Sequence, residues 1–125
     1  MIMLKSAAVW AVVGDVLNAS KPASRVVARL QANNKYVHLI NPRAAPEDCF
    51  PTLAAAHEVK PIEAVNLIIN PKIGPAFIDE MIALEIPNLF IQPGAAPSDD
   101  VLERASSAGI TIQHGCVLVE MPESP

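Results

Sequence analysis

The stretch AVWAVVGDVLNASKPASRVVARL, residues 8–30, decides the fold of this chain. It begins with the apolar run 9–13, continues through one glycine and a polar loop, and ends in a helical pattern over about 23–33. In that pattern two valines and Leu30 share one face, as the 3.6-residue period of a helix requires. A buried strand, a loop and an amphipathic helix in this order are typical of the first unit of an α/β protein.

The rest of the chain repeats this alternation. The apolar runs 36–40, 64–69, 88–91 and about 110–113 predict four more strands, and we expect the tail CVLVEM to add a short extension. Helical patterns are predicted at about 53–58 and 75–84, and between the cap Ser98 and Gly109. Thr52 suits the N-cap of the first of these helices, and Pro75 suits the first position of the second.

Strands that alternate with helices at this spacing predict a parallel sheet with right-handed crossovers. The expected fold is a single doubly wound, Rossmann-like α/β domain with a five-stranded parallel sheet in the order 3-2-1-4-5. We expect one domain over residues 1–125, with its core at about 8–120, because no linker, repeat or low-complexity segment divides the chain.

Charge is distributed unevenly along the chain. The net charge is −4, which argues against nucleic acid as the main partner. Residues 1–46 carry six lysines and arginines against the single acid Asp15, whereas residues 47–125 are strongly acidic. An acidic protein with its cations gathered in one third of the chain favours a small anionic ligand there, although a solvated basic helix face explains the charges equally well.

Other features narrow the class of protein. No apolar run approaches the roughly 20 residues that span a bilayer, so we expect no membrane association and a cytoplasmic location, with an organellar matrix left open. Cys49 and Cys116 are far apart, and the three histidines are scattered. Since these spacings match no ligand motif, we predict neither a metal site nor a disulfide.

The loop after the first strand lacks the usual nucleotide motifs. Only Gly14 is present where a dinucleotide fingerprint has three glycines, and the second strand ends at Asn41 rather than at an acid for a ribose hydroxyl. The segment SKPASR instead places Lys21 and Arg25 at the start of the predicted helix. Free N–H groups and the helix dipole attract anions there, so the loop predicts an anion site of another kind.

Four turns should meet at one edge of the sheet, because ligands of open α/β folds bind beyond the carboxyl ends of the strands. Two of these turns are Asn-Pro followed by a basic residue. The alternative explanation is that Asn-Pro simply ends a strand, as it often does. The four turns are Gly14-Asp15, Asn41-Pro42-Arg43, Asn70-Pro71-Lys72 and Gln92-Pro93-Gly94.

From 9 to 119 the sequence resembles the small stand-alone CoA-binding proteins, whose fold is shared with the CoA-binding domain of succinyl-CoA synthetase α-subunits. The landmarks are VVG, SKPASRVVARL, INP, FPTLAAA, NLIINPK, LFIQPGA and AGITIQHGC, in this order. The resemblance implies a CoA or acyl-CoA ligand across the strand ends. The ligand-binding residues that it implies are Gly14, Asp15, Ser20, Lys21, Pro22, Ser24, Arg25, Asn41, Pro42, Arg43, Pro71, Lys72, Ile73, Gln92, Pro93 and Gly94.

The sequence departs from the family pattern at ligand-facing turns. Asp15-Val16 stand where the family has a small residue and Ser, and a carboxylate beside a diphosphate is repulsive unless it turns away. Asn34-Lys35 replace the usual glycine before the second strand, and the loop after Pro42 is shortened. These departures affect the expected ligand more than the expected fold.

We assign no catalytic residue and favour binding over catalysis, with enzymatic activity left open. His114 and Cys116 are two residues apart, which would place them on one side of a strand. Cys116 is therefore a candidate redox thiol, although a packed thiol explains it as well. The alternatives are an NAD(P)-dependent oxidoreductase-like domain and a degenerate Rossmann-like domain for protein interaction or thiol redox chemistry. The expected partner is CoA itself, and a homodimer is left open.

Overall fold

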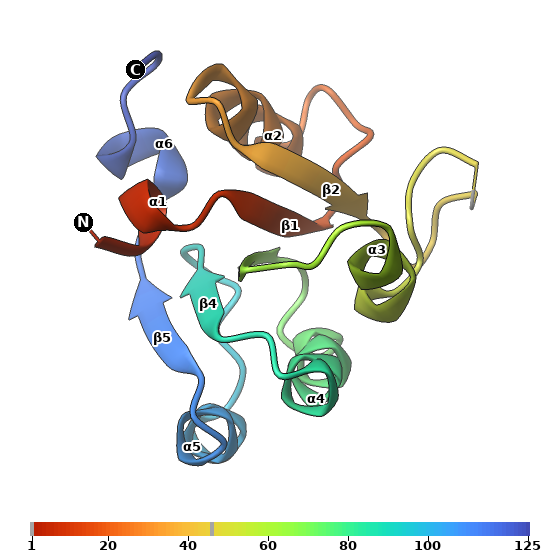
Figure 1. Ribbon diagram of the computed structural model, residues 1–125. Helices are drawn as coiled ribbons and strands as arrows, with labels where there is room; N and C mark the ends of the chain where they lie inside the picture. The colour runs from red at the N-terminus through yellow and green to blue at the C-terminus, as the bar shows by residue number, and fades with distance from the viewer. Residues whose placement is uncertain (1, 46) are drawn as a thin grey trace.

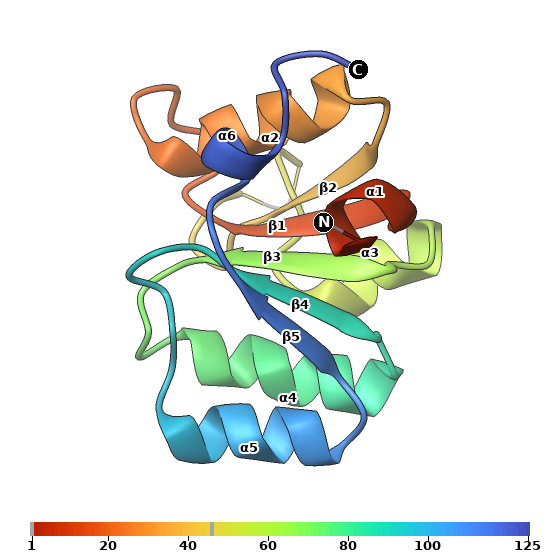
Figure 2. The same ribbon diagram turned by 90° about the vertical axis from the view of Figure 1, so that its left-hand side faces the viewer.

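Five parallel strands form the central sheet of the computed structural model, which describes residues 2–45 and 47–125 (Figures 1 and 2). The strands are β1 (Val9–Gly14), β2 (Tyr36–Ile40), β3 (Ala64–Ile68), β4 (Asn88–Ile91) and β5 (Thr111–His114). The helices are α1 (Ile2–Ser6), α2 (Pro22–Ala32), α3 (Leu53–Val59), α4 (Gly74–Leu84), α5 (Asp99–Ser107) and α6 (Val117–Glu120). The predicted doubly wound α/β class is confirmed.

Helices cover both faces of the sheet. In Figure 2, α2 and α6 lie above the sheet and α4 and α5 lie below it. One apolar core joins α1, α2 and α6 to one face, around Trp10 and Phe90. A second core joins α3, α4 and α5 to the other face, around Leu67 and Leu89. Strands buried on both sides explain why their sequences are continuous apolar runs.

The strand order differs from the prediction in the place of one strand. The observed order is β2-β1-β3-β4-β5, so β3 lies beside β1 rather than outside β2. The reason is that α3 packs on the face opposite α2, through Leu53 and Ala56. A right-handed crossover over that face carries the chain back past β1.

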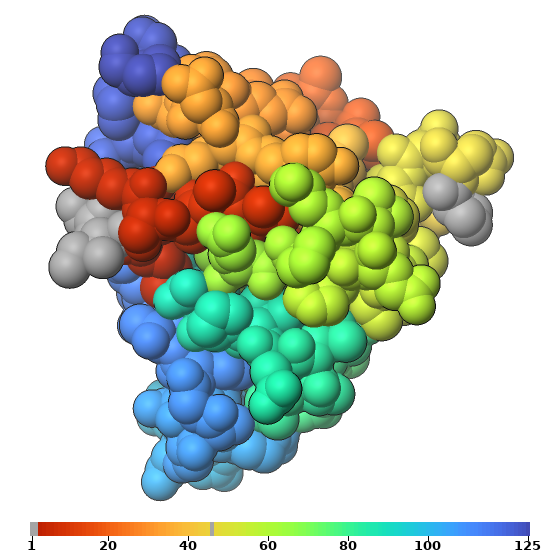
Figure 3. Space-filling model, viewed as in Figure 1, coloured from red at the N-terminus to blue at the C-terminus, as the bar shows by residue number. Residues whose placement is uncertain are grey.

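The position outside β2 is partly filled by one extended residue. Phe50 forms an isolated parallel bridge with Ile40. Its N–H donates to the Leu39 carbonyl oxygen at 2.9 Å, and its carbonyl oxygen accepts from the Asn41 N–H at 3.0 Å. The loop between β2 and α3 is thus fixed to the sheet at its end, while its part coloured yellow projects at the right of Figure 3.

Two short helices were not predicted. The tail after β5 forms α6 instead of extending the strand, and its Val117 is buried against Phe90 and the α2 face. At the other end, α1 buries Met3 and Leu4. The predicted caps are correct: Thr52 Oγ1 accepts from the Ala55 N–H at 3.2 Å, and Ser98 caps α5.

Candidate functional site

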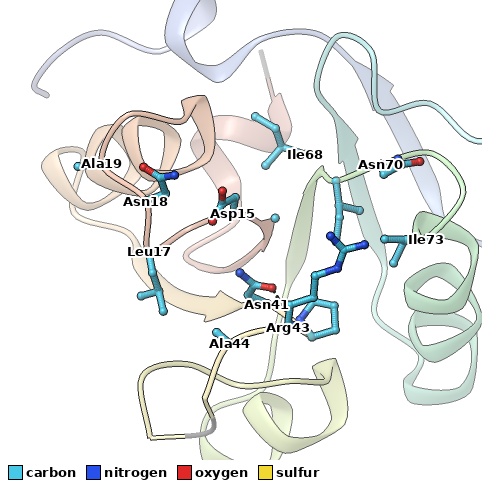
Figure 4. A pocket seen from close by; sticks show the side chains of 13 residues that line it. Asp15, Leu17, Asn18, Ala19, Asn41, Arg43, Ala44, Ile68, Asn70 and Ile73 are labelled. Carbon is cyan, nitrogen blue, oxygen red and sulfur yellow. Dashed lines mark hydrogen bonds between the residues drawn. The ribbon is translucent and has the colours of Figure 1, made fainter.

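A pocket of about 750 Å³ opens at the carboxyl ends of β1, β2 and β3 (Figure 4). The chain leaves β1 toward β2 on one side and returns through α3 to β3 on the other, so the crossovers diverge here. Such a reversal of strand order leaves a crevice that binds ligands in open α/β sheets. The lining residues are Gly14, Asp15, Leu17, Asn18, Ala19, Asn41, Pro42, Arg43, Ala44, Ile68, Ile69, Asn70 and Ile73.

Gly14 has a steric role at the base of this pocket. It pairs with Ile68 of β3, and a Cβ at position 14 would collide with the Ile68 carbonyl oxygen. Its backbone is not in the left-handed region, unlike that of Gly94 and Gly109, so conformation does not require glycine. Glycine is needed here because β1 and β3 approach each other closely where the pocket begins.

Two identical turns form part of the wall. Asn41 Oδ1 accepts from the Arg43 N–H at 2.9 Å, and Asn70 Oδ1 accepts from the Lys72 N–H at 2.9 Å. A side chain that accepts from the N–H two residues on makes an Asx turn, and the intervening proline fixes its backbone. Both asparagines line the pocket, and each turn leaves the Nδ2 group as the donor that can reach a ligand.

The pocket carries one side chain of each charge. Figure 4 shows Asp15 and Arg43 facing the same space from the loops after β1 and β2. Both residues are exposed. Within residues 2–45 and 47–125 the only ion pair joins Arg104 to Asp79, so neither charge in the pocket is paired by the protein. A ligand therefore meets both charges without first breaking a salt bridge.

Beside the pocket, the loop before α2 leads to a helix start without a side-chain cap. Asn18 Oδ1 accepts from the Ser20 N–H at 3.1 Å and from its Oγ at 2.7 Å. Lys21 is the N-cap residue of α2 and makes no capping bond through its side chain, and Pro22 follows. The first-turn N–H groups of α2 thus lack a side-chain acceptor, and Lys21 and Arg25 are exposed beside them.

The structure brings some of the predicted residues together and leaves others outside the lining. Gly14, Asp15, Asn41, Pro42, Arg43 and Ile73 line the pocket. The predicted residues that do not line it are Ser20, Lys21, Pro22, Ser24, Arg25, Pro71, Lys72, Gln92, Pro93 and Gly94. The lining that sequence reasoning missed includes Leu17, Ile68 and Ile69. The sequence predicts both isoleucines as part of a strand, whereas β3 ends at Ile68, which pairs with Gly14 at the base of the pocket, and Ile69 follows it.

Gln92 is buried in a polar network rather than directed at the pocket. Its Oε1 accepts from the Val117 N–H at 2.9 Å and from Asn66 Nδ2 at 3.2 Å, and its Nε2 lies 3.4 Å from Cys116 Sγ. The backbone donor of Val117 fixes which end of the Gln92 amide is oxygen. Asn66 Oδ1 consequently has no partner among the described residues. Gln92 attaches α6 to the sheet.

Cys116 is half-buried and is the N-cap residue of α6. The prediction that it shares a strand side with His114 is wrong, because β5 ends at His114. Both cysteines are free, and burial raises the pKa of the Cys49 thiol. Within the part of the chain that the structure describes, no cluster of three metal-ligating side chains exists and no helix has the length and apolarity to span a bilayer.

The fold and the pocket define a class of protein: a Rossmann-like α/β domain with its ligand pocket at the reversal of strand order. The family is established by sequence, since residues 8–122 match the model of the CoA-binding domain. The chain belongs to this CoA-binding domain family. A comparison with curated proteins gives no significant match.

Solved structures show the same fold. A Thermus thermophilus protein superposes with a TM-score of 0.83 at 24% identity, covering 94% of this chain and 90% of its own. A hypothetical protein from Pyrococcus horikoshii superposes with a TM-score of 0.81 at 20% identity, and the match covers 91% of this chain and 80% of the Pyrococcus horikoshii chain. A conserved hypothetical protein from Pyrococcus furiosus superposes with a TM-score of 0.75 at 24% identity, and the match covers 90% of this chain and 97% of the Pyrococcus furiosus chain. At these identities the likeness concerns the fold.

Proposed function

We propose that this protein binds CoA or an acyl-CoA across the carboxyl ends of its strands and does not catalyse a reaction. The observation that carries the proposal is the pocket of about 750 Å³ at the reversal of strand order, beside the uncapped start of α2. Its size is within the range of about 300–1,000 Å³ that is usual for small-molecule sites.

The diphosphate is assigned to the start of α2. First-turn N–H groups, the helix dipole and the side chains of Lys21 and Arg25 together favour a strongly anionic group. Lys21 and Arg25, which do not line the pocket, thus have a role at its rim, while the nucleoside occupies the pocket between Asn41 and Asn70.

The side chains of the pocket support binding without catalysis. The described lining residues provide one carboxylate, one guanidinium, amides and apolar groups, and none of them is a nucleophile with an adjacent base. A hydride-transfer domain is less favoured, because Asn41 follows β2 where an NAD-binding domain places an acid.

Ligand-induced stabilisation tests this function. A ligand that binds only the native state raises the melting temperature, so CoA should raise it, and NADH and NADPH should not. No shift at millimolar CoA would contradict the proposal. Stabilisation by NADH alone would favour the oxidoreductase-like reading.

Charge reversal tests the assigned phosphate site. Lys21→Glu with Arg25→Glu should weaken CoA binding at least about tenfold, because two attractive charges become repulsive. The matched control is Lys60→Glu, an exposed lysine at the C-terminal end of α3. Titration calorimetry measures both, and equal affinity in the double variant and the control would show that the diphosphate does not bind at α2.

A further inference from the structure

We propose that Asp15 determines ligand specificity by binding the free hydroxyl groups of the ribose, so that dephospho-CoA binds this pocket more tightly than CoA. The inference rests on the proposed function and deepens it. It concerns a single carboxylate that lines the pocket and the single substituent by which the two ligands differ, the phosphate on the ribose 3′-oxygen.

Asp15 differs from the other short polar residues of the pocket in having no structural task. Asn18, Asn41 and Asn70 each accept a backbone N–H two residues on and so close their own turns. The turn at Asp15 is closed by main-chain atoms alone, since the Val16 N–H donates to the Gly14 carbonyl oxygen at 2.9 Å. Within the described residues no donor reaches the Asp15 carboxylate, so its oxygens are available to a ligand.

Three carboxylates elsewhere in the chain accept hydrogen bonds from the backbone. Glu63 accepts from the Ala8 N–H at 2.7 Å, and Glu120 accepts from the Cys116 N–H at 2.9 Å. Glu80 accepts two N–H groups at the start of α3. These three carboxylates stabilise the fold through backbone N–H groups, and Asp15 makes no such contact with the described residues.

The position of Asp15 fits the ribose. It is the first residue after β1 and faces the pocket, while the proposed diphosphate site at Lys21 and Arg25 lies at the rim. In CoA the ribose is the first group after the diphosphate on the nucleoside side, so it is the first group to enter the pocket. An ionised carboxylate accepts hydrogen bonds from hydroxyl groups and donates none.

A phosphate on the ribose would replace one of those donors by negative charge. Two like charges disfavour one another, and among the described residues no cation forms an ion pair with Asp15 that would cancel its charge. Arg43 is the one cation among the lining residues and comes from a different loop. The inference requires that Arg43 contributes equally to the binding of both ligands, so its removal should weaken both alike.

Titration calorimetry with CoA and dephospho-CoA tests the inference. In the natural protein dephospho-CoA should bind about twofold to fivefold more tightly, the range expected of one exposed charge pair. Asp15→Asn and Asp15→Ser should remove that preference, and the control Glu103→Gln on α5 should keep it. Arg43→Gln should weaken both ligands by the same factor.

The outcomes separate this inference from the proposed function. CoA binding more tightly than dephospho-CoA, with a ratio that Asp15→Asn leaves unchanged, would overturn the role of Asp15 only. A selective loss of CoA binding in Arg43→Gln would also overturn it, because Arg43 would then bind the 3′-phosphate. Failure of both ligands to bind any variant at millimolar concentration would overturn the proposed function and this inference together.

Discussion

At the scale of single residues, Gly14 shows how one position serves both the sheet and the site. In the sequence it resembles the remaining glycine of a dinucleotide loop. In the structure it permits the close approach of β1 to β3, because any Cβ would meet the Ile68 carbonyl oxygen. The pocket starts at that contact, so a change at Gly14 alters the strand spacing before it alters any ligand contact.

Gly14→Ala should therefore destabilise the native state even without ligand. The added methyl group meets backbone rather than a flexible side chain, so the expected loss is about 1–3 kcal/mol in the free energy of unfolding. Urea unfolding measures it. The control is Gly94→Ala, where no atom lies within 4 Å of the new Cβ and only the positive φ of 82° resists it. An unchanged midpoint for Gly14→Ala would contradict the steric role.

His38 predicts a pH dependence of stability. It is 3% exposed, lies edge-on to Tyr36 and Phe50, and its Nε2 is 3.0 Å from the Lys60 carbonyl oxygen. Burial lowers the pKa of His38, although the hydrogen bond to Lys60 acts in the opposite direction, and nearby His57 and Lys60 lower it further.

Because the pKa of His38 is lower in the folded state, the unfolded chain takes up the proton first as pH falls. The free energy of unfolding should thus be largest above about pH 6.5 and should decrease below it. Urea unfolding between pH 7.5 and 5.5 measures this slope. His38→Gln should reduce it, and an equal slope in that variant would assign the effect to other groups.

At the scale of elements, α3 decides the strand order, and its start is fixed from another helix. Glu80 of α4 accepts the Leu53 N–H at 3.0 Å and the Ala54 N–H at 3.1 Å. Thr52 caps the next N–H, of Ala55. These contacts hold α3 against α4 on the face opposite α2, and this placement brings β3 to the side of β1.

Removing the Glu80 carboxylate should destabilise the N-terminal turn of α3. Glu80→Ala loses two hydrogen bonds and a negative charge at the positive end of the helix dipole, so we expect a loss of about 1–2 kcal/mol in the free energy of unfolding. Glu103→Ala, an exposed acid on α5, is the control and should change it by less than about 0.5 kcal/mol. Equal unfolding midpoints in the two variants would contradict the capping role.

At the scale of the whole molecule, the sequence allowed the strands and long helices to be predicted but not their arrangement. The buried runs are continuous and are punctuated by Asn-Pro, Gly and clear caps, which define the elements locally. Strand order depends on which face α3 packs against, and this is settled by contacts with Phe77 and Met81 distant in sequence. The helices α1 and α6 have five and four residues, too few for a period to show.

The same distinction applies to the site. The polar turns at the strand ends were recognisable because each follows an apolar run directly. Ile68 and Ile69 were not recognisable as lining residues, because in the sequence an apolar residue at the end of a strand looks the same as one in its interior. Gln92 was misleading for the opposite reason: a polar residue after β4 is buried because the backbone of α6 bonds to it.

The overall charge distribution predicts salt-sensitive binding. The chain has a net charge of −4, but the proposed phosphate site combines Lys21, Arg25 and a helix start. Affinity for CoA should fall severalfold as salt rises from about 50 to 500 mM, since the Debye length shortens from above 10 Å to below it. Lys21→Gln should flatten this dependence in calorimetric titrations, and a salt-independent affinity would contradict an electrostatic site.

The paired Asn-Pro turns also affect how the pocket ages. Asparagine deamidates when the nitrogen of the next residue attacks its side-chain amide, and a prolyl nitrogen carries no hydrogen to allow this cyclisation. Asn41 and Asn70, both followed by proline, are thereby protected from conversion to aspartate. Asn18, followed by Ala19, has no such protection. Two of the three side-chain amides of the pocket are thus protected from this route to a new negative charge.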